Sequence, residues 1–127
     1  MKKIILLAAL FCFPCMLSHL YAQSIQNTNW KAFVADPLND TLTIHIRTDS
    51  SFVTNSKGDV LVRSNYTIVG DTLTISDYGT GDYVCPDMKG SYKFVRSGDN
   101  LIFTLIDDPC EGRAQTLNGS KWIKGLK

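Results

Sequence analysis

The chain has 127 residues, 44% of them hydrophobic, and a formal net charge of +1. Removing Lys2 and Lys3, which belong to an expected leader, from the 13 basic residues leaves 11 against 12 acidic residues. A nearly neutral domain without a basic stripe argues against nucleic acid or an anionic membrane surface as a partner. The sequence therefore predicts one small domain with no nucleic-acid partner.

The first 22 residues have the pattern of a signal peptide. Two lysines form a basic start, residues 4–17 are an apolar run, and a short polar stretch ends at Ala22. The run is shorter than the about 20 residues that a membrane span needs. We therefore expect cleavage after Ala22, which leaves residues 23–127 as an exported domain with no membrane span. A lipid anchor at Cys12 or Cys15 is the less favoured alternative, because neither follows a small residue.

Strand patterns alternate with turn signals at short intervals after the leader, and no segment keeps a 3.6-residue apolar period for three turns. In the clearest strand, Leu42, Ile44 and Ile46 share one face. Strands are expected at residues 30–35, 41–47, 51–55, 60–63, 65–69, 72–77, 90–96 and 101–107, with a last one within 113–123. The domain is therefore predicted to be all-β.

One hairpin is specified by both its turn and its apolar face. Residues 70–71 are Gly-Asp, which fits a two-residue type II′ turn. This turn pairs Ile68 with Leu73 and Tyr66 with Ile75 on one face. A shift of one residue would place apolar side chains opposite polar ones, so the register is well defined.

A second hairpin follows the same rule. Residues 98–99 are again Gly-Asp, and the turn pairs Phe94 with Phe103 and Tyr92 with Leu105. The result is a continuous apolar face.

A third hairpin around residues 57–58 would join residues 52–54 to 61–63, with a less clear register. One contiguous antiparallel meander best removes its unpaired edges by closing into an up-and-down barrel of about eight strands. A two-sheet β-sandwich is the alternative. Residues 77–89 form the longest irregular stretch and are predicted to be a loop.

Only Cys85 and Cys110 remain after cleavage, and exported proteins meet an oxidising environment. We expect a disulfide between them, worth about 3.5 kcal/mol for a closed loop of roughly 25 residues. Two unpaired buried thiols are the alternative. Two distant cysteines and one remaining histidine, His45, do not supply a closed ligand set, so no metal and no other cofactor is expected.

The interior of an eight-stranded barrel is either filled by side chains or just wide enough for one small ligand. The side chains expected to face inward are Leu42, Ile44, Ile46, Tyr66, Ile68, Leu73, Ile75, Tyr92, Phe94, Phe103 and Leu105. So many bulky groups in a small domain favour a filled core or a shallow cup at one mouth over a deep cavity.

A set of motifs stands in one order in the C-terminal third of the chain. Cys85 is followed by Gly-x-Tyr-x-Phe at 90–94, Gly-Asp-x-Leu at 98–101, Asp-x-Cys-x-x-Arg at 108–113, and Trp122. This order resembles that of the small secreted lipocalin-like domains of bacteria, in the calycin superfamily, over residues 65–123. The resemblance implies a calycin-type barrel in a bacterial protein that is periplasmic or secreted.

In the wider lipocalin family, a Gly-x-Trp on the first strand closes one end of the barrel, and an Arg near the last strand packs across that Trp. The corresponding stretch here is Thr28-Asn29-Trp30, which has the tryptophan and lacks the glycine. The resemblance thus implies a barrel-end lid of Trp30, Arg113 and Trp122, with Arg113 as the covering cation. Such a cation–π contact is worth about 0.5–2 kcal/mol. A lid without a role in ligand binding is the favoured interpretation of these three residues.

The sequence holds no Gly-x-Ser-x-Gly, no His-Glu-x-x-His and no glycine-rich loop before a helix, so no enzymatic activity is expected. Two functions are left open. In one, the barrel mouth holds a small apolar or amphipathic ligand between Tyr66, Tyr92, Phe94 and Phe103, with Tyr83 on a covering loop. In the other, the core is filled, and the disulfide-braced loop binds an envelope protein as an interaction or inhibitor module.

Overall fold

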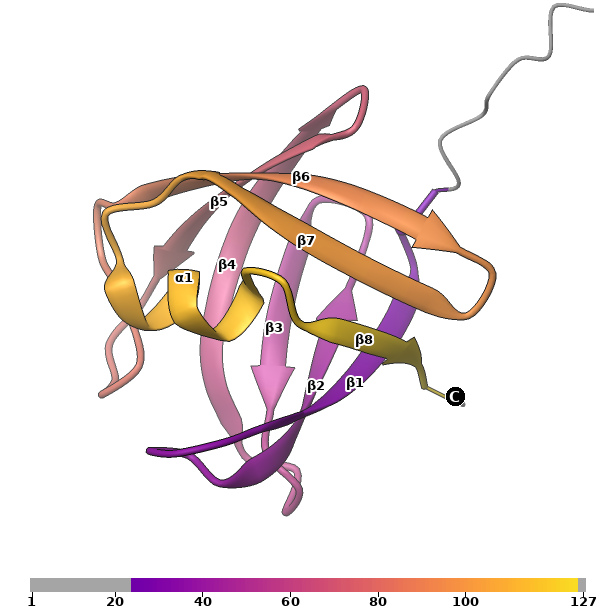
Figure 1. Cartoon of the computed structure of the whole chain (residues 1–127). Coiled ribbons are helices and arrows are strands. Elements are labelled where there is room, and N and C mark those ends of the chain that lie inside the picture. Colours follow the sequence, from indigo (N-terminus) through magenta and orange to yellow (C-terminus); the bar gives the residue numbers. More distant parts are fainter. Residues whose placement is uncertain (1–23, 126–127) are drawn as a thin grey trace, which may run out of the picture.

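Alternating apolar and polar residues build eight antiparallel strands that pair in chain order and close into a barrel (Figure 1). The strands are β1 Thr28–Val34, β2 Asp40–Ile46, β3 Ser50–Thr54, β4 Val60–Val69, β5 Thr72–Tyr78, β6 Lys89–Ser97, β7 Asn100–Asp107 and β8 Lys121–Lys124, and the helix α1 spans Glu111–Leu117. The computed structural model describes residues 24–125, so the expected signal peptide, residues 1–22, lies outside the described residues. The prediction of an all-β up-and-down barrel is confirmed, and the sandwich is not observed.

The two hairpins that were expected from their turns have the expected registers. In β4 and β5, Ile68 pairs with Leu73 and Tyr66 with Ile75. Gly70 has a φ of 61°, a backbone conformation that type II′ turns require and that glycine adopts without a steric penalty.

The other hairpins also form. Phe94 pairs with Phe103 across β6 and β7. The third hairpin joins β3 to β4, with Val53 opposite Val62 and an irregularity directly after Val53. This shift in register explains why the alternation of side chains alone did not define the pairing of that hairpin.

Two of the predicted strands are one continuous strand. The break expected between residues 60–63 and 65–69 is absent, because Ser64 faces the barrel interior within β4 and donates a hydrogen bond to Asp77 Oδ1 at 2.7 Å. A polar residue at an inward position hid the alternation. One strand edge of β4 pairs with β3 and the other with β5.

The last predicted strand, expected within residues 113–123, is the short β8, which covers only the end of that range. Residues 111–117 are the helix α1, and β8 begins only at Lys121. The helix has seven residues and buries only Leu117, so it gives no apolar period that sequence analysis can detect.

Leu105 is 36% exposed and was expected inside the barrel. The short β8 pairs with β7 only at residues 100–102. Beyond that point β7 has no strand on this side, so Leu105 is covered less than Phe103, which is 1% exposed.

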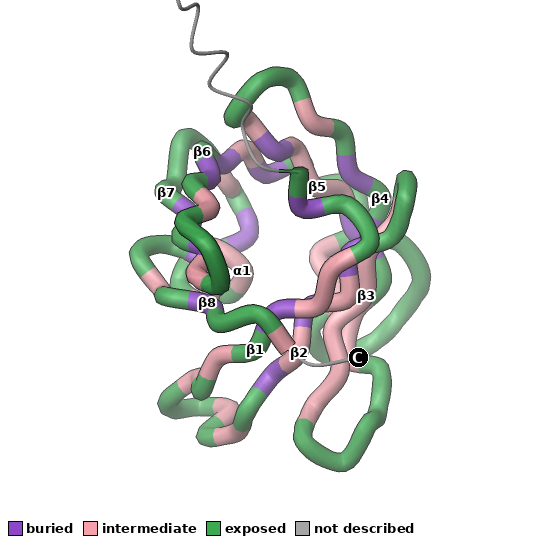
Figure 2. Tube along the Cα trace, turned by 90° about the vertical axis from the view of Figure 1, so that its right-hand side faces the viewer, coloured by how far each residue is buried: buried purple, intermediate pink, exposed green. Residues whose placement is uncertain are grey.

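The barrel has two different ends, which we name by their coverage. The closed end carries residues 24–27 and the turns at 70–71 and 98–99, and the open end carries the loops at 35–39, 55–59 and 79–88 together with α1 (Figure 1). In Figure 2, buried segments line the ring of strands while the loops are exposed. The two ends therefore differ in what covers the interior.

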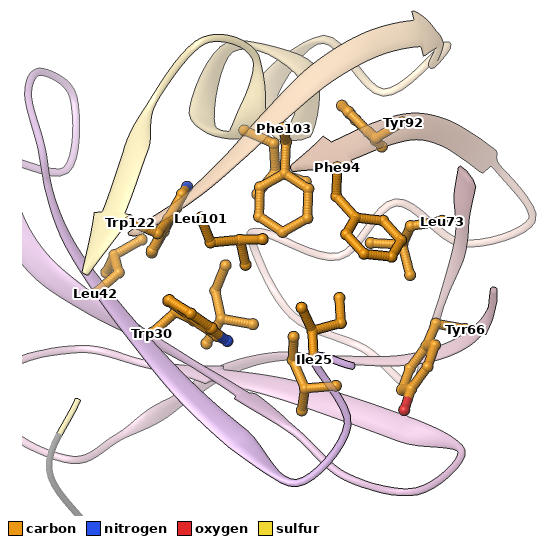
Figure 3. Close-up of a cluster of buried hydrophobic side chains, with 13 residues drawn as sticks. Ile25, Trp30, Leu42, Tyr66, Leu73, Tyr92, Phe94, Leu101, Phe103 and Trp122 are labelled. Atoms are coloured by element: carbon orange, nitrogen blue, oxygen red, sulfur yellow. The ribbon is translucent and has the colours of Figure 1, made fainter. Parts of the chain in front are cut away.

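The closed end is packed with side chains. Ile25 and Trp30 are both 0% exposed, and Trp30 Nε1 donates to Thr28 Oγ1 at 2.7 Å. The Thr28 hydroxyl in turn donates to the carbonyl of Ile25. Figure 3 shows the indole of Trp30 within the cluster of buried side chains. A hydrogen-bonded turn thus places an apolar plug across this end.

The cation that covers Trp30 is Arg96 and not Arg113. The guanidinium carbon of Arg96 lies 5.2 Å from the ring centroid of Trp30, whereas Arg113 belongs to α1 at the open end. Arg96 is next to the 98–99 turn at the closed end, so the topology brings it to Trp30. Trp122 is fully buried and pairs with Leu101 in the barrel wall.

Candidate functional site

The open end contains a cavity of about 130 Å³. Its wall is made largely of aliphatic side chains from β2 to β5, which are Leu42, Ile44, Val53, Leu61, Val62 and Ile75. Leu38 from the 35–39 loop, Tyr83 from the 79–88 loop, and Trp122 complete the apolar wall. Four residues of α1, at positions 112, 113, 116 and 117, also line the cavity. The helix thus closes the space that β8 is too short to cover.

A smaller cavity of about 30 Å³ lies deeper in the barrel. It shares Ile44, Ser51, Ile75 and Leu117 with the larger one, so the two are adjacent. Below them the core is packed, and Phe94 and Leu101 are 5% and 0% exposed. The interior is therefore filled at the closed end and hollow near the open end.

The aromatic residues that were predicted to bind a ligand are distributed differently. Tyr83 lines the larger cavity, and Tyr66 and Phe103 line only the smaller one. Tyr92 and Phe94 line neither cavity. The structure therefore brings one of the five predicted residues to the main cavity.

Leu42, Ile44 and Ile75 were expected to face inward and do line the cavity, but the rest of the aliphatic wall was missed for a physical reason. Val53 and Leu61 come from the hairpin whose register is irregular, so the sequence did not define which way they face. Leu117 lies in a helix too short to be recognised. Leu38 belongs to a loop, and no periodic signal marks it.

One side of the larger cavity is polar, and we call Ser64, Asp77 and Arg113 the polar corner. Arg113 Nη1 lies 3.0 Å from Asp77 Oδ1, and the two side chains are 10% and 2% exposed. Asp77 also accepts hydrogen bonds from Ser64 Oγ at 2.7 Å and from the Cys85 N–H at 3.0 Å. This corner joins β4, β5, the 79–88 loop and α1.

Asp108, a second carboxylate that does not line the cavity, also binds Arg113. Arg113 Nε donates to Asp108 Oδ2 at 2.7 Å, and Nη2 donates to Asp108 Oδ1 at 2.8 Å, a bidentate pair. Nη2 also donates to the carbonyl of Met88 at 2.8 Å. The Tyr92 hydroxyl donates to Asp108 Oδ2. Arg113 is thus a link between the loop, the helix and β6.

These contacts shift the pKa values of the buried groups. Burial alone would raise the pKa of Asp108, but hydrogen bonds from Arg113, Tyr92 and the Cys110 N–H outweigh it and lower that pKa. Burial, followed by its hydrogen bond to Asp108, raises the pKa of Tyr92. Burial would lower the pKa of Arg113, and its two carboxylate partners raise it instead. At neutral pH Asp108 and Arg113 are therefore charged and Tyr92 is neutral.

Gly90 allows Asp108 to lie where it does. A Cβ atom at this position would overlap the carboxylate of Asp108. Gly90 pairs with Ile75 in the β5–β6 ladder, so the carboxylate packs directly over strand backbone. The glycine of the Gly-x-Tyr-x-Phe motif is therefore required by a close approach.

The expected disulfide between Cys85 and Cys110 is present, with a Cα–Cα distance of 6.0 Å and a sequence separation of 25. It joins the 79–88 loop to the residue that precedes α1. Both segments line the cavity, so the disulfide fixes two parts of its wall to each other.

Comparison with known proteins finds no family model, no curated protein and no solved structure that matches the chain. Between residues 24 and 125, no helix is long and apolar enough to cross a membrane. In the same described part of the chain, no three His, Cys, Asp or Glu side chains are grouped so that they could hold a metal ion.

Proposed function

We propose that the chain is an exported, non-enzymatic binding protein that holds a small apolar or amphipathic molecule in the open-end cavity of a lipocalin-like barrel. The observation that carries the proposal is the cavity itself, with an aliphatic wall and one polar corner. Small-molecule sites typically combine an apolar lining with a few placed polar groups. The Cys85–Cys110 disulfide supports a periplasmic or secreted location, because disulfides persist in oxidising compartments.

The size of the cavity limits the ligand. Its volume is about 130 Å³, close to the roughly 150 Å³ of an engineered apolar cavity that binds benzene. Sites for drug-sized ligands are larger, on the order of 300–1,000 Å³. The ligand is therefore one ring, or the end of a chain whose remainder passes Tyr83, which is 51% exposed, into solvent.

The test is displacement of a lipophilic fluorescent dye from the exported protein, with native mass spectrometry to detect a retained molecule. The variant Val53→Phe places a ring inside the cavity and is expected to lower dye binding by at least about tenfold, because overfilling the space excludes other molecules. Val95→Phe adds the same ring to an outer-face position that is 54% exposed, and it should bind dye as the unchanged protein does. Equal binding by both variants, or no binding by the unchanged protein, would refute the proposal.

One observation favours the second function, an envelope interaction or inhibitor module. Tyr78, Tyr83 and Met88 lie at or near the 79–88 loop and are 43%, 51% and 40% exposed. Exposed aromatic and methionine side chains are enriched at protein interfaces. In this case a Tyr83→Ser variant should lose a specific protein partner from an envelope extract, while Val53→Phe keeps that partner.

A further inference from the structure

The polar corner limits which chemical group a ligand can present to it, and this inference rests on the proposed binding function. Arg113 carries one positive charge, and Asp77 and Asp108 carry two negative charges within 3.0 Å of it. All three side chains are at least nine-tenths buried, with exposures of 10%, 2% and 0%. Each is poorly screened by solvent, and the excess negative charge belongs to Asp108, which lies behind Arg113 and does not line the cavity.

This arrangement disfavours a carboxylate on the ligand. The ligand would bring a third negative charge to one guanidinium that already holds two carboxylates. Taking a carboxylate out of water is costly unless a charge of opposite sign compensates for it. Here the bidentate pair with Asp108 has already engaged Nε and Nη2 of Arg113.

An ammonium group is disfavoured for a different reason. Asp77, the carboxylate that lines the cavity, is already neutralised by Arg113. A ligand cation would lose its hydration in the apolar cavity, and the only carboxylate that lines the described cavity already has Arg113 as its partner, so nothing compensates for that cost.

A neutral hydroxyl can form hydrogen bonds with both Arg113 and Asp77. Arg113 Nη1 is buried and forms an ion pair with Asp77 Oδ1 at 3.0 Å, but among residues 24–125 it has no hydrogen-bond partner of good geometry. A hydroxyl oxygen accepts a hydrogen bond, and its proton can be donated to a carboxylate such as Asp77. A small shift of the Arg113 side chain toward the cavity would therefore complete one hydrogen bond on each of the two charged groups. A buried donor without a well-placed partner is unfavourable, and a hydroxyl ligand would supply that partner.

We propose that the cavity selects a compact neutral molecule, about one ring in size, that carries a single hydroxyl group, and that it discriminates against carboxylates and amines of the same size. The ring would contact the aliphatic wall formed by residues such as Val53 and Ile75. The hydroxyl would lie at the polar corner between Asp77 and Arg113. The ligand class is therefore an alcohol or a phenol rather than a fatty acid.

The test uses four probes that share one ring and one exocyclic carbon, which are benzyl alcohol, benzoate, benzylamine and toluene. Their dissociation constants for the exported protein are measured at neutral pH by NMR titration. Benzyl alcohol is expected to bind about three- to tenfold more tightly than toluene, the range of one net hydrogen bond. It should bind at least about tenfold more tightly than benzoate and benzylamine. The variant Val53→Phe should abolish binding of all four.

The outcomes separate this inference from the binding function. If toluene or benzoate binds as tightly as benzyl alcohol, the hydroxyl preference is wrong and the binding function stands. If no probe binds, both are wrong. The variant Asp77→Asn gives a second measurement. Because it removes one negative charge, it should raise the affinity for benzoate relative to that for benzyl alcohol by about threefold or more. If Asp77→Asn does not fold, the four probes on the unchanged protein decide the question alone.

Discussion

At the scale of single residues, the position of Asp108 depends on Gly90 having no side chain. Gly90→Ala would place a methyl group into the Asp108 carboxylate and push it away from Arg113 and Tyr92. We expect a loss of about 3 kcal/mol in the free energy of unfolding, the range for a broken buried ion pair. Gly112→Ala is the matched control, because its Cβ meets nothing within 4 Å in α1, and Ala is favoured over Gly in a helix by about 1 kcal/mol. Urea unfolding of both variants measures this difference, and equal effects would contradict the assigned role of Gly90.

The lowered pKa of Asp108 makes a further prediction about acid stability. A carboxyl whose pKa is lower in the folded state stabilises the fold above its ordinary value of 3.8 and loses that contribution as the pH falls through the folded-state pKa. The variant Asp108→Asn should therefore be less stable than the unchanged protein by about 3 kcal/mol at neutral pH, and this gap should narrow below about pH 4.

Asp71→Asn is the control for this pH dependence. Asp71 pairs with Lys93 at 3.6 Å, and its side chain is 53% exposed, so its removal should change stability by less than about 1 kcal/mol. Unfolding by urea at several pH values compares the two variants. A gap for Asp108→Asn that stays constant down to the lowest pH would show that its ionised form does not stabilise the fold.

At the scale of elements, the hairpins were predictable and the segment after β7 was not. A Gly-Asp turn and the two apolar faces beside it define a register locally, so the pairing of Phe94 with Phe103 followed from the sequence. The helix α1 and the contact of Arg96 with Trp30 depend on the closed barrel. Trp30 and Arg96, which are 66 positions apart, meet because β1 begins and β6 ends at the closed end of the barrel. Neither the helix α1 nor the contact between Arg96 and Trp30 can therefore be predicted from local sequence patterns.

The disulfide is the covalent link between two of these elements. The double variant Cys85→Ser with Cys110→Ser should lose about 3.5 kcal/mol of unfolding free energy, the chain-entropy value for a loop of this length. Reduction of the unchanged protein should give the same loss. Intact mass should show two hydrogens fewer in the exported protein than in its reduced form, and an exported protein with two free thiols would contradict the structure.

At the scale of the whole molecule, one barrel has a filled end and a hollow end. The apolar plug of Ile25 and Trp30 closes one end, whereas the short β8 and the helix α1 leave a cavity near the other. The sequence predicted the barrel and, since the inward faces are bulky, either a filled core or a shallow cup at one mouth. It placed Leu42, Ile44 and Ile75 on the inward face but did not predict the rest of the cavity wall, because those residues come from an irregular hairpin, a loop and a short helix.

The most direct test of this account is amide NMR mapping of the exported, isotope-labelled protein during titration with the tightest-binding ring probe. Shift changes should concentrate at the open end, at residues such as Val53, Leu61 and Leu117, and leave Ile25 and Trp30 at the closed end unchanged. Shift changes centred on the closed end or on the outer faces of the strands, or no saturable change at all, would contradict the assignment of the open-end cavity as the binding site.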